Sequence, residues 1–247
     1  MKNGNGTQKN TTTPIWKLTQ LELYPERPAQ YTQRILDQQS SNLMEQAYLD
    51  IKRKIQNCEY MPGTELNEKM LYADFPYGRT PIREAILYLK RDGLIEVFPR
   101  KGMRITSIAA KELSDVFALR RILENSAFSD NAALSQKDVL INFGKELDAM
   151  QEEERRLFEL DQNLHTVLVQ ALRNELLNET YAALLDKSYR AYCYFMQNKG
   201  FLGKRIYTQD IALIQGMLHE DLAAVRLAIE EYNRSILIEL LEGLPQA

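Results

Sequence analysis

Residues 78–86, with the sequence Gly-Arg-Thr-Pro-Ile-Arg-Glu-Ala-Ile, constrain the fold of this chain more than any other stretch. Apolar residues recur there at helical spacing and would form one stripe: Ile82, Ala85, Ile86 and Leu89. Pro81 is tolerated because it falls in the first turn of such a helix. Arg79, Thr80 and Arg83 then share a polar face near the helix N-terminus. We therefore predict a short amphipathic helix whose first turns present two arginines.

A helix of this kind can insert its N-terminal end into the DNA major groove. Arginine can donate two hydrogen bonds to a guanine edge, and the free N–H groups of a helix N-terminus favour phosphate oxygens. Two arginines at positions i and i+4 are, however, usually a solvated helix face. The pair alone does not establish DNA binding, so the flanking sequence has to decide.

Two further helices are expected upstream of this one. In the first, apolar residues recur at helical spacing: Leu43, Ala47, Tyr48, Ile51 and Ile55. Pro62 and Gly63 then break the chain. A second short helix follows, with three expected buried positions: Leu66, Met70 and Leu71.

A β-hairpin is expected downstream, after Gly93 ends the arginine-bearing helix. Its predicted strands are residues 94–98 and 103–106, joined by the turn 99–102, which contains Arg100 and Lys101. Three helices followed by a hairpin with a basic tip are typical of a winged helix-turn-helix. We place this domain at residues 43–106.

Charge is unevenly distributed along the chain, which has a formal net charge of -3. Residues 41–106 contain 11 Lys and Arg against 9 Asp and Glu, whereas residues 107–247 contain 15 against 22. A chain this acidic does not bind nucleic acid through its bulk charge. DNA contact must come from a locally basic face, and the acidic half must have another role.

The remaining composition indicates a cytoplasmic protein without a membrane partner. Cys58 and Cys193 lack metal-binding or redox-motif spacing and are expected to be reduced structural thiols. No apolar run approaches the roughly 20 residues of a membrane span. The polar N-terminus lacks the apolar segment of a signal peptide. We expect an N-terminal extension over residues 1–42 that is disordered to about residue 14.

The second half of the chain is expected to be entirely helical. Residues 110–243 contain no proline, and apolar residues follow helical periodicity almost without interruption. The expected helices cover residues 110–133, 136–155, 157–172, 175–197, 204–219 and 222–242. An antiparallel bundle over residues 107–247 can build a ligand pocket between facing helices. The predicted fold class is therefore mainly α, with an N-terminal winged helix-turn-helix and a C-terminal antiparallel bundle.

Residues 43–106 resemble the DNA-binding domain of the GntR family of bacterial transcription regulators. The resemblance rests on Pro62-Gly63, Leu66, residues 79–85, Leu89, Gly93-Leu94 and Lys101-Gly102. It implies a dimer on a short palindromic operator in double-stranded DNA. The DNA-contacting residues it implies are Lys69, Arg79, Thr80 and Arg83 in the helices and Arg100, Lys101 and Gly102 in the wing. Residues 76–78, Pro-Tyr-Gly, depart from the usual Gly-Val-Ser, so Gly78 lacks a hydroxyl for capping or phosphate contact.

Residues 115–124 resemble the first helix of the FCD effector domain of FadR-like GntR regulators. Asp161 and His165, followed by residues 171–174, resemble its first metal-ligand helix. In that family an aspartate and three histidines commonly hold a divalent metal beside a small carboxylate effector. Here the two remaining histidine positions fall on Asp210 and Tyr232. His219 lies nine residues beyond Asp210 and should point to a different helix face.

Three interpretations of this second site remain open. Asp161, His165 and Asp210 could bind a divalent ion such as Zn, Ni or Mn, since i and i+4 residues share a helix face. Alternatively, the pocket could bind its ligand directly through Arg120, His165, Asp210 and Tyr232. In the third interpretation, Asp161 and His165 are only a helix-face pair. Arg120 matches the family's pocket-facing arginine, and a guanidinium suits an acidic ligand.

The sequence therefore predicts a ligand-responsive regulator rather than an enzyme. A small effector, an organic acid by resemblance, would bind the helical domain and change operator affinity. One alternative is an architectural DNA-binding protein without an effector. Another is a metal-dependent enzyme with an accessory DNA-binding domain. The sequence disfavours the enzyme, because it shows neither a nucleophile–base pair near His165 nor a Gly-rich phosphate loop.

Overall fold

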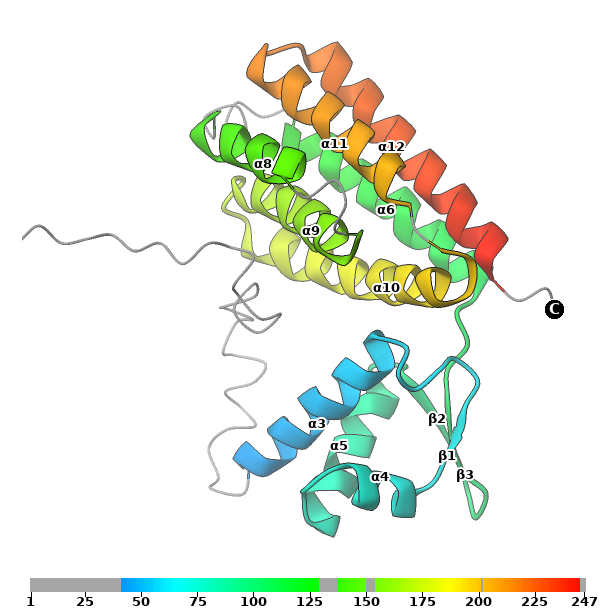
Figure 1. Cartoon of the computed structure of the whole chain (residues 1–247). Helices are drawn as coiled ribbons and strands as arrows, with labels where there is room; N and C mark the ends of the chain where they lie inside the picture. Colours follow the sequence, from blue (N-terminus) through cyan, green and yellow to red (C-terminus); the bar gives the residue numbers. More distant parts are fainter. Residues whose placement is uncertain (1–40, 129–136, 150–153, 201, 245–247) are drawn as a thin grey trace, which may run out of the picture.

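Helices α3, α4 and α5 and a small sheet form the lower part of the molecule in Figure 1, and helices α6 to α12 form the upper part. This computed structural model describes residues 41–128, 137–149, 154–200 and 202–244. The lower elements are α3 (Ser41–Gln56), β1 (Glu65–Leu66), α4 (Glu68–Asp74), α5 (Arg79–Arg91), β2 (Ile95–Phe98) and β3 (Gly102–Ile105). The expected N-terminal extension lies outside the described residues.

Helix α5 is the predicted arginine-bearing helix. Its four expected apolar positions are all buried, which confirms the predicted stripe. They pack on α3 and on the sheet within one hydrophobic core. Gly78 precedes the helix without a side-chain capping bond, whereas the Asn67 side chain caps α4 by accepting from the Met70 N–H at 3.1 Å.

The second helix begins only at Glu68, and two of its three expected buried positions differ from the prediction. Met70 is 40% exposed, so its predicted burial is wrong. Leu66 is buried, but it belongs to strand β1 and pairs with Met103 of β3 rather than lying in a helix. With seven residues, α4 buries only Leu71.

The hairpin forms the centre and one edge of a three-stranded antiparallel sheet of order β1-β3-β2. Arg100 and Gly102 both adopt positive φ in the tight connection between β2 and β3. A Cβ at residue 102 would lie 2.8 Å from the carbonyl oxygen of Leu66. Glycine at this position therefore allows β1 to pair closely with β3.

The upper part is a bundle of antiparallel and crossing helices. The described helices are α6 (Ala110–Phe128), α8 (Lys137–Ala149), α9 (Glu154–Gln170), α10 (Glu175–Lys199), α11 (Gly203–Leu218) and α12 (Leu222–Gly243). These agree with the expected helices to within a few residues, while residues 129–136 and 150–153 lie outside the described part. No described helix is long and apolar enough to cross a membrane.

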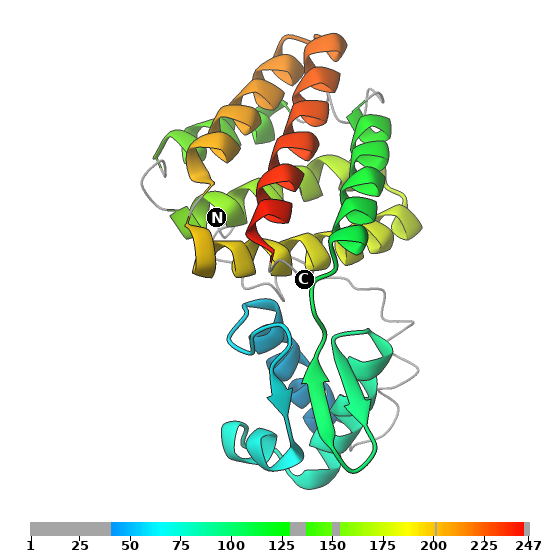
Figure 2. The ribbon, with the colours of Figure 1, turned by 90° about the vertical axis from the view of Figure 1, so that its right-hand side faces the viewer.

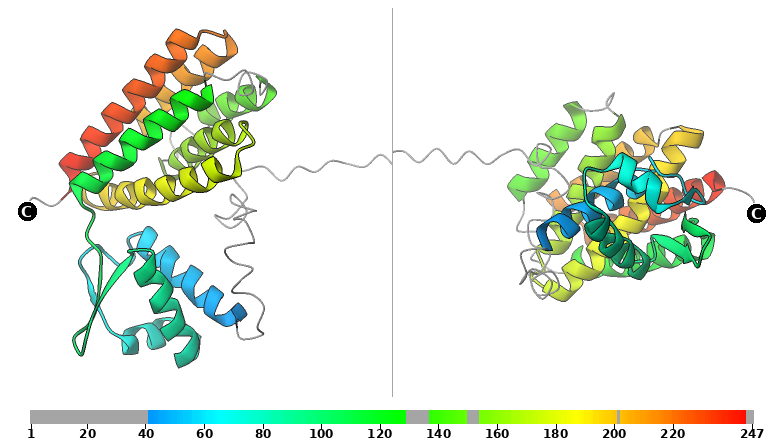
Figure 3. Two further views of the ribbon diagram at one scale, coloured as in Figure 1. Left: turned by 180° about the vertical axis from the view of Figure 1, so that it is seen from behind. Right: turned by 90° about the horizontal axis from the view of Figure 1, so that it is seen from below.

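Helix α10 lies at the bottom of the bundle, directly above the N-terminal elements (Figure 2). A short segment after β3 leads into α6, which packs on α12 and α10. Views from behind and from below show the N-terminal elements under the bundle, with the C-terminal end of α3 near α10 (Figure 3). Helix α10 therefore has neighbours in both parts of the molecule.

Candidate functional site

The first candidate site is the exposed polar face of α4 and α5. Arg79, Thr80 and Arg83 are exposed on α5, and Lys69 is exposed on α4. Arg83 donates from Nε to Glu68 Oε2 at 2.9 Å, and its side chain is 62% exposed. The Arg79 guanidinium lies 5.9 Å from the centre of the Tyr72 ring. These contacts join the two helices and keep both arginines at the surface.

The wing extends beside this face and carries the other predicted DNA contacts. Arg100 and Lys101 are exposed in the turn between β2 and β3. Gly102 begins β3 and is partly buried against Leu66. The structure thus gives Gly102 a backbone role in the sheet, whatever contact it makes with DNA.

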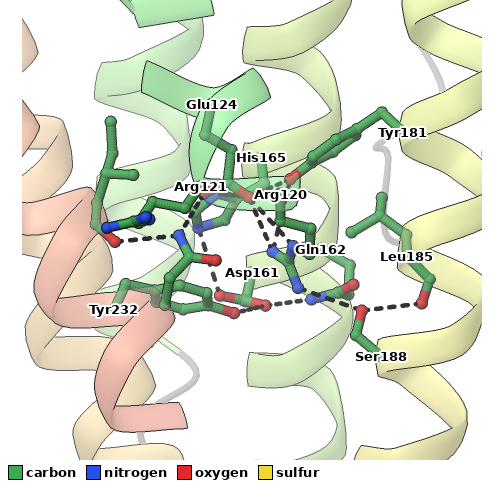
Figure 4. A network of polar contacts seen from close by, with 12 residues as sticks. Arg120, Arg121, Glu124, Asp161, Gln162, His165, Tyr181, Leu185, Ser188 and Tyr232 are labelled. Carbon is green, nitrogen blue, oxygen red and sulfur yellow. Dashed lines mark hydrogen bonds and ion pairs between the residues drawn. The ribbon is translucent and has the colours of Figure 1, made fainter. Parts of the chain in front are cut away.

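The second candidate site is a buried polar network inside the bundle, drawn in Figure 4. Helices α6, α9, α10, α11 and α12 all contribute to it. Its members are Arg120 and Glu124 on α6, Asp161, Gln162 and His165 on α9, Tyr181 and Ser188 on α10, Asp210 on α11, and Tyr232 and Asn233 on α12. Each of these side chains is buried.

Arg120 lies at the centre of the network and already has an acidic partner. Its Nε and one terminal nitrogen contact Glu124 Oε1 at 3.2 and 3.1 Å. The other terminal nitrogen donates to Ser188 Oγ at 3.2 Å. Tyr181 donates its hydroxyl to the same Glu124 oxygen at 2.5 Å. Glu124 therefore provides inside the fold the carboxylate that we expected an effector to bring to Arg120.

His165 lies between Glu124 and the aspartates. Its Nδ1 is 3.4 Å from Glu124 Oε1, and its Nε2 is 3.7 Å from Asp161 Oδ1 and 3.8 Å from Asp210 Oδ1. Burial alone would lower the pKa of His165, but Glu124, Asp210 and Asp161 raise it to about 10. A carboxylate at ion-pair distance from one ring nitrogen and candidate ligands near the other resemble the surroundings of a metal-binding histidine, although Nδ1 makes no hydrogen bond to Glu124 among the described residues.

The two aspartates have different environments. Asp161 Oδ2 accepts from the Tyr232 hydroxyl at 2.8 Å and from Gln162 at 2.5 Å. Burial and the neighbouring Asp161 raise the pKa of Asp210 to about 8, against the opposing effect of His165. Asp210 is therefore costly to ionise unless a further positive charge is present.

Buried atoms without partners show that the donor set fits a divalent cation. Asp161, His165 and Asp210 each offer one ligand atom, and these atoms lie within 4.8 Å of one another. Asp161 Oδ1, His165 Nε2 and both Asp210 oxygens have no hydrogen-bond partner within the described part of the chain. Buried charges are normally paired or bound to metal. The buried carboxylates are those of Glu124, Asp161 and Asp210, and the buried guanidinium is that of Arg120. Together they leave two negative charges, which a divalent ion or two protons would neutralise.

A third set of contacts joins the N-terminal elements to α10. Lys52 of α3 forms a 2.6 Å ion pair with Asp186. The Tyr189 hydroxyl donates to Asn57 Oδ1 at 3.0 Å. Residues that follow α3 and β3 make further contacts with α10. Gln197 donates to the Asn57 carbonyl, and Arg190 donates to the side chain and backbone of Thr106. The Cys58 thiol donates to the Arg190 carbonyl. The same helix carries Tyr181 and Ser188 of the buried network.

Comparison with known families agrees with both halves of this structure. Residues 43–105 match the model of the bacterial regulatory proteins of the gntR family, and residues 115–231 match the FCD domain. The chain contains a GntR-type DNA-binding domain and an FCD domain. Its matched families and curated relatives are transcriptional regulators rather than enzymes.

Individual GntR relatives are distant. The chain is 31% identical over 135 residues to the HTH-type transcriptional regulator YdhC of Bacillus subtilis, covering 52% of this chain and 60% of the relative. It is 29% identical over 131 residues to the transcriptional repressor RspR of Escherichia coli, covering 51% and 58%. A GntR regulator structure from Rhodococcus sp. RHA1 aligns with a TM-score of 0.66 at 17% identity, covering 81% of this chain and 97% of that one. This last similarity supports the fold alone.

The structure brings the predicted second-site residues together and adds others. Arg120, Asp161, His165 and Tyr232 belong to the buried network (Figure 4), and Asp210 joins it next to His165. His219 instead lies exposed at the end of α11 and contacts the Gln215 carbonyl, as its spacing indicated. The sequence interpretation did not predict the part played by five further members: Glu124, Gln162, Tyr181, Ser188 and Asn233. Glu124 follows Arg120 by four residues, and this spacing was the one available signal.

Proposed function

We propose that this GntR-family protein is a ligand-responsive transcriptional regulator of the cytoplasm that binds a palindromic DNA operator as a homodimer. One observation carries this proposal: α10 contacts both the buried polar network and the DNA-binding domain. A ligand that repositions α10 changes DNA affinity insofar as it prefers one arrangement of the two domains.

The DNA-contacting residues in this proposal lie on two neighbouring surfaces. Arg79, Thr80 and Arg83 at the start of α5 would enter the major groove, with Lys69 of α4 on the adjacent backbone. The wing residues Arg100, Lys101 and Gly102 would approach the minor groove. The exposure of the charged residues and the burial of the opposite α5 face support this orientation.

The ligand site in this proposal is the buried network, with a divalent cation held by Asp161, His165 and Asp210. Their unpartnered atoms and the excess of buried negative charge support a cation. When bound, the ion would supply open coordination positions for an effector oxygen. Because Glu124 already pairs with Arg120, a small organic acid would depend on the ion more than on this arginine.

The same site without a metal is the other candidate, and it differs in its protonation. Protons on His165 and Asp210 would then balance the charges, since their pKa values are raised to about 10 and about 8. An effector would bind directly to Arg120, His165, Asp210 and Tyr232. Elemental analysis of the purified protein separates the two forms of the proposal.

The test begins with selection of a DNA site from a random-sequence pool by the purified full-length protein. Native mass spectrometry would report the subunit count and any retained ion. Fluorescence anisotropy would then measure DNA affinity with and without Mn²⁺, Zn²⁺, Ni²⁺ and a panel of small organic acids. We expect two copies per site, and a change of about 5- to 150-fold with the correct ligand.

Arginine variants test the DNA face directly. Replacement of Arg79 or Arg83 by Ala should each cost about 1–3 kcal/mol of DNA-binding free energy if each contacts a base edge. Arg91→Ala is the matched control, because Arg91 is an exposed arginine at the opposite end of α5. Full affinity of the Arg79→Ala, Arg83→Ala double variant would contradict the proposed face. A selected DNA site whose affinity no metal or acid alters would support an architectural protein instead.

A further inference from the structure

The chain contains two cysteines, and both lie where the DNA-binding domain meets the bundle. Cys58 follows the end of α3, is 2% exposed, and has a positive φ of 53°. Its sulfur lies 3.5 Å from the carbonyl oxygen of Arg190, on α10. Cys193 is three residues further along the same helix and is partly buried. Both are thiols in this structure.

Helix geometry brings the two sulfurs to the same turn of α10. Residues three apart share one helix face, and each Cα–Cβ bond tilts toward the helix N-terminus. The Cys193 side chain therefore lies over the turn that contains Arg190, where Cys58 makes its contact. Burial and then the nearby Cys193 raise the pKa of the Cys58 thiol to about 12, which agrees with a short separation.

We propose that Cys58 and Cys193 form a reversible disulfide that ties the DNA-binding domain to α10 when low-molecular-weight disulfides accumulate. In a reducing compartment, disulfides of this kind are usually transient and redox-sensing rather than structural. Oxidation of the pair would thus act on α10, the same helix through which the effector is proposed to change DNA affinity.

The exposure of the two thiols sets the order of the reaction. The Cys193 thiolate, which is the more exposed of the two, attacks one sulfur of an oxidised low-molecular-weight thiol. The proton that Cys193 lost on forming this thiolate is taken up by the thiolate that leaves, and a mixed disulfide remains on Cys193. Cys58 then loses its proton and attacks the Cys193 sulfur, and the second leaving thiolate takes up that proton; the raised pKa of Cys58 makes this the slower step. The sum is one protein disulfide and two reduced small thiols from two protein thiols and one small disulfide.

The bond would fix an interface that is otherwise held by reversible polar contacts. The Lys52–Asp186 ion pair and the Asn57–Tyr189 hydrogen bond lie on the same side of α10 as Cys58. A covalent bond at this place removes the freedom of the DNA-binding domain to reorient against the bundle. The effect on DNA rests on the proposed function, whereas formation of the disulfide does not.

The first experiment tests the disulfide in the reduced full-length protein, incubated under native conditions with oxidised glutathione. Intact mass should fall by two hydrogens without a glutathione adduct, and peptide mapping should recover Cys58 joined to Cys193. The Cys58→Ser variant should retain one glutathione on Cys193, and Cys193→Ser should remain unmodified. Two adducts on the wild-type chain, an unchanged reduced protein, or a bond between two copies would each overturn the proposal. Circular dichroism of each variant establishes that it is folded.

The second experiment measures DNA affinity of the reduced and oxidised protein on a site selected by the reduced form. We expect a change of about 5-fold or more on oxidation, reversed by dithiothreitol and absent in Cys193→Ser. Unchanged affinity in a protein with a mapped Cys58–Cys193 bond would overturn the regulatory role. Failure of the reduced protein to select any DNA would overturn the proposed function instead, and the disulfide would be judged by mass alone.

Discussion

Arg120 and Arg121 are neighbours on α6, yet their ion pairs lie in opposite environments. The side chains of Arg120 and Glu124 are 1% and 0% exposed, whereas those of Arg121 and Glu230 are 47% and 42% exposed. A buried ion pair gains little over apolar packing, but loss of one partner leaves an uncompensated charge. The two pairs therefore form a matched comparison within one protein.

Glu124→Gln should lower the free energy of unfolding by about 3–5 kcal/mol, because Arg120 and His165 both lose a counter-charge. Glu230→Gln should lower it by less than about 1 kcal/mol, since solvent screens the Arg121 pair. Urea unfolding followed by circular dichroism measures both. Equal losses in the two variants would show that Glu124 does not hold the buried guanidinium in place.

Replacing glycine by alanine should lower the stability of the protein at one position, Gly102, and raise it at another, Gly144. Gly102→Ala should destabilise the winged domain by about 1–3 kcal/mol, because φ is +98° and the new Cβ would meet the Leu66 carbonyl at 2.8 Å. Gly144 lies within α8, and a Cβ added there would meet nothing within 4 Å. Gly144→Ala should therefore raise the free energy of unfolding by about 0.5–1 kcal/mol. Thermal unfolding of both variants is the measurement, and an undiminished stability of Gly102→Ala would contradict the close approach of β1 to β3.

Helices α9 and α11 pack against each other and together carry the three side chains that could hold a cation. Asp161 and His165 are one turn apart on α9, and Asp210 of α11 completes the group. Asp210→Asn should weaken Mn²⁺ binding at least about tenfold through loss of an anionic ligand. Asp210→His should shift preference from Mn²⁺ toward Ni²⁺, because imidazole suits the latter. Isothermal titration calorimetry measures both, with Asp221→Asn, at the exposed N-cap of α12, as the control. Unchanged affinities would remove Asp210 from the site.

Cation affinity should also rise with pH. Without a bound cation, the protonated forms of His165 and Asp210 are favoured at pH 7, since their surroundings raise the pKa values to about 10 and about 8. A cation must displace these protons, so binding releases protons and strengthens as pH increases toward about 10. Calorimetry in buffers of different ionisation enthalpy counts the released protons. A cation that binds without proton release would have a different ligand set.

Elements defined by local periodicity were predictable, and those defined by distant contacts were not. The α5 stripe and the bundle helices follow from residues three and four apart, and the structure confirms them. Strand β1 has two residues, too few to show alternation, and it exists because Leu66 pairs with Met103. The predicted burial of Met70 was wrong because α4 is too short to cover a second position.

The same limit applies to the buried network. Asp161 and His165 could be paired from their spacing within one helix. Asp210 and Tyr232 could be placed only through family resemblance, since they lie on other helices. The bond of Tyr181 to Glu124 joins residues 57 positions apart, and no local pattern marks it.

At the scale of the whole molecule, α10 connects the DNA-binding domain to the buried network. Arg190 donates to the backbone and side chain of Thr106, at the exit of the wing. Ser188, two residues earlier, accepts from Arg120. A change around Arg120 therefore has a short physical route to the wing, through one helix.

Arg190→Ala should uncouple ligand binding from DNA binding while leaving each intact. Loss of the contacts to Thr106 removes the bias that α10 exerts on the wing, so a cation should still bind but change DNA affinity less than about twofold, rather than the 5-fold or more expected for the wild type. Arg234→Ala is the control, because this exposed arginine of α12 pairs with Glu231 on the same helix. Anisotropy titrations with and without Mn²⁺ measure the coupling, and calorimetry checks that cation affinity is retained. Coupling of wild-type size in Arg190→Ala would place the communication at other contacts of α10, such as the Lys52–Asp186 ion pair or the Tyr189–Asn57 hydrogen bond.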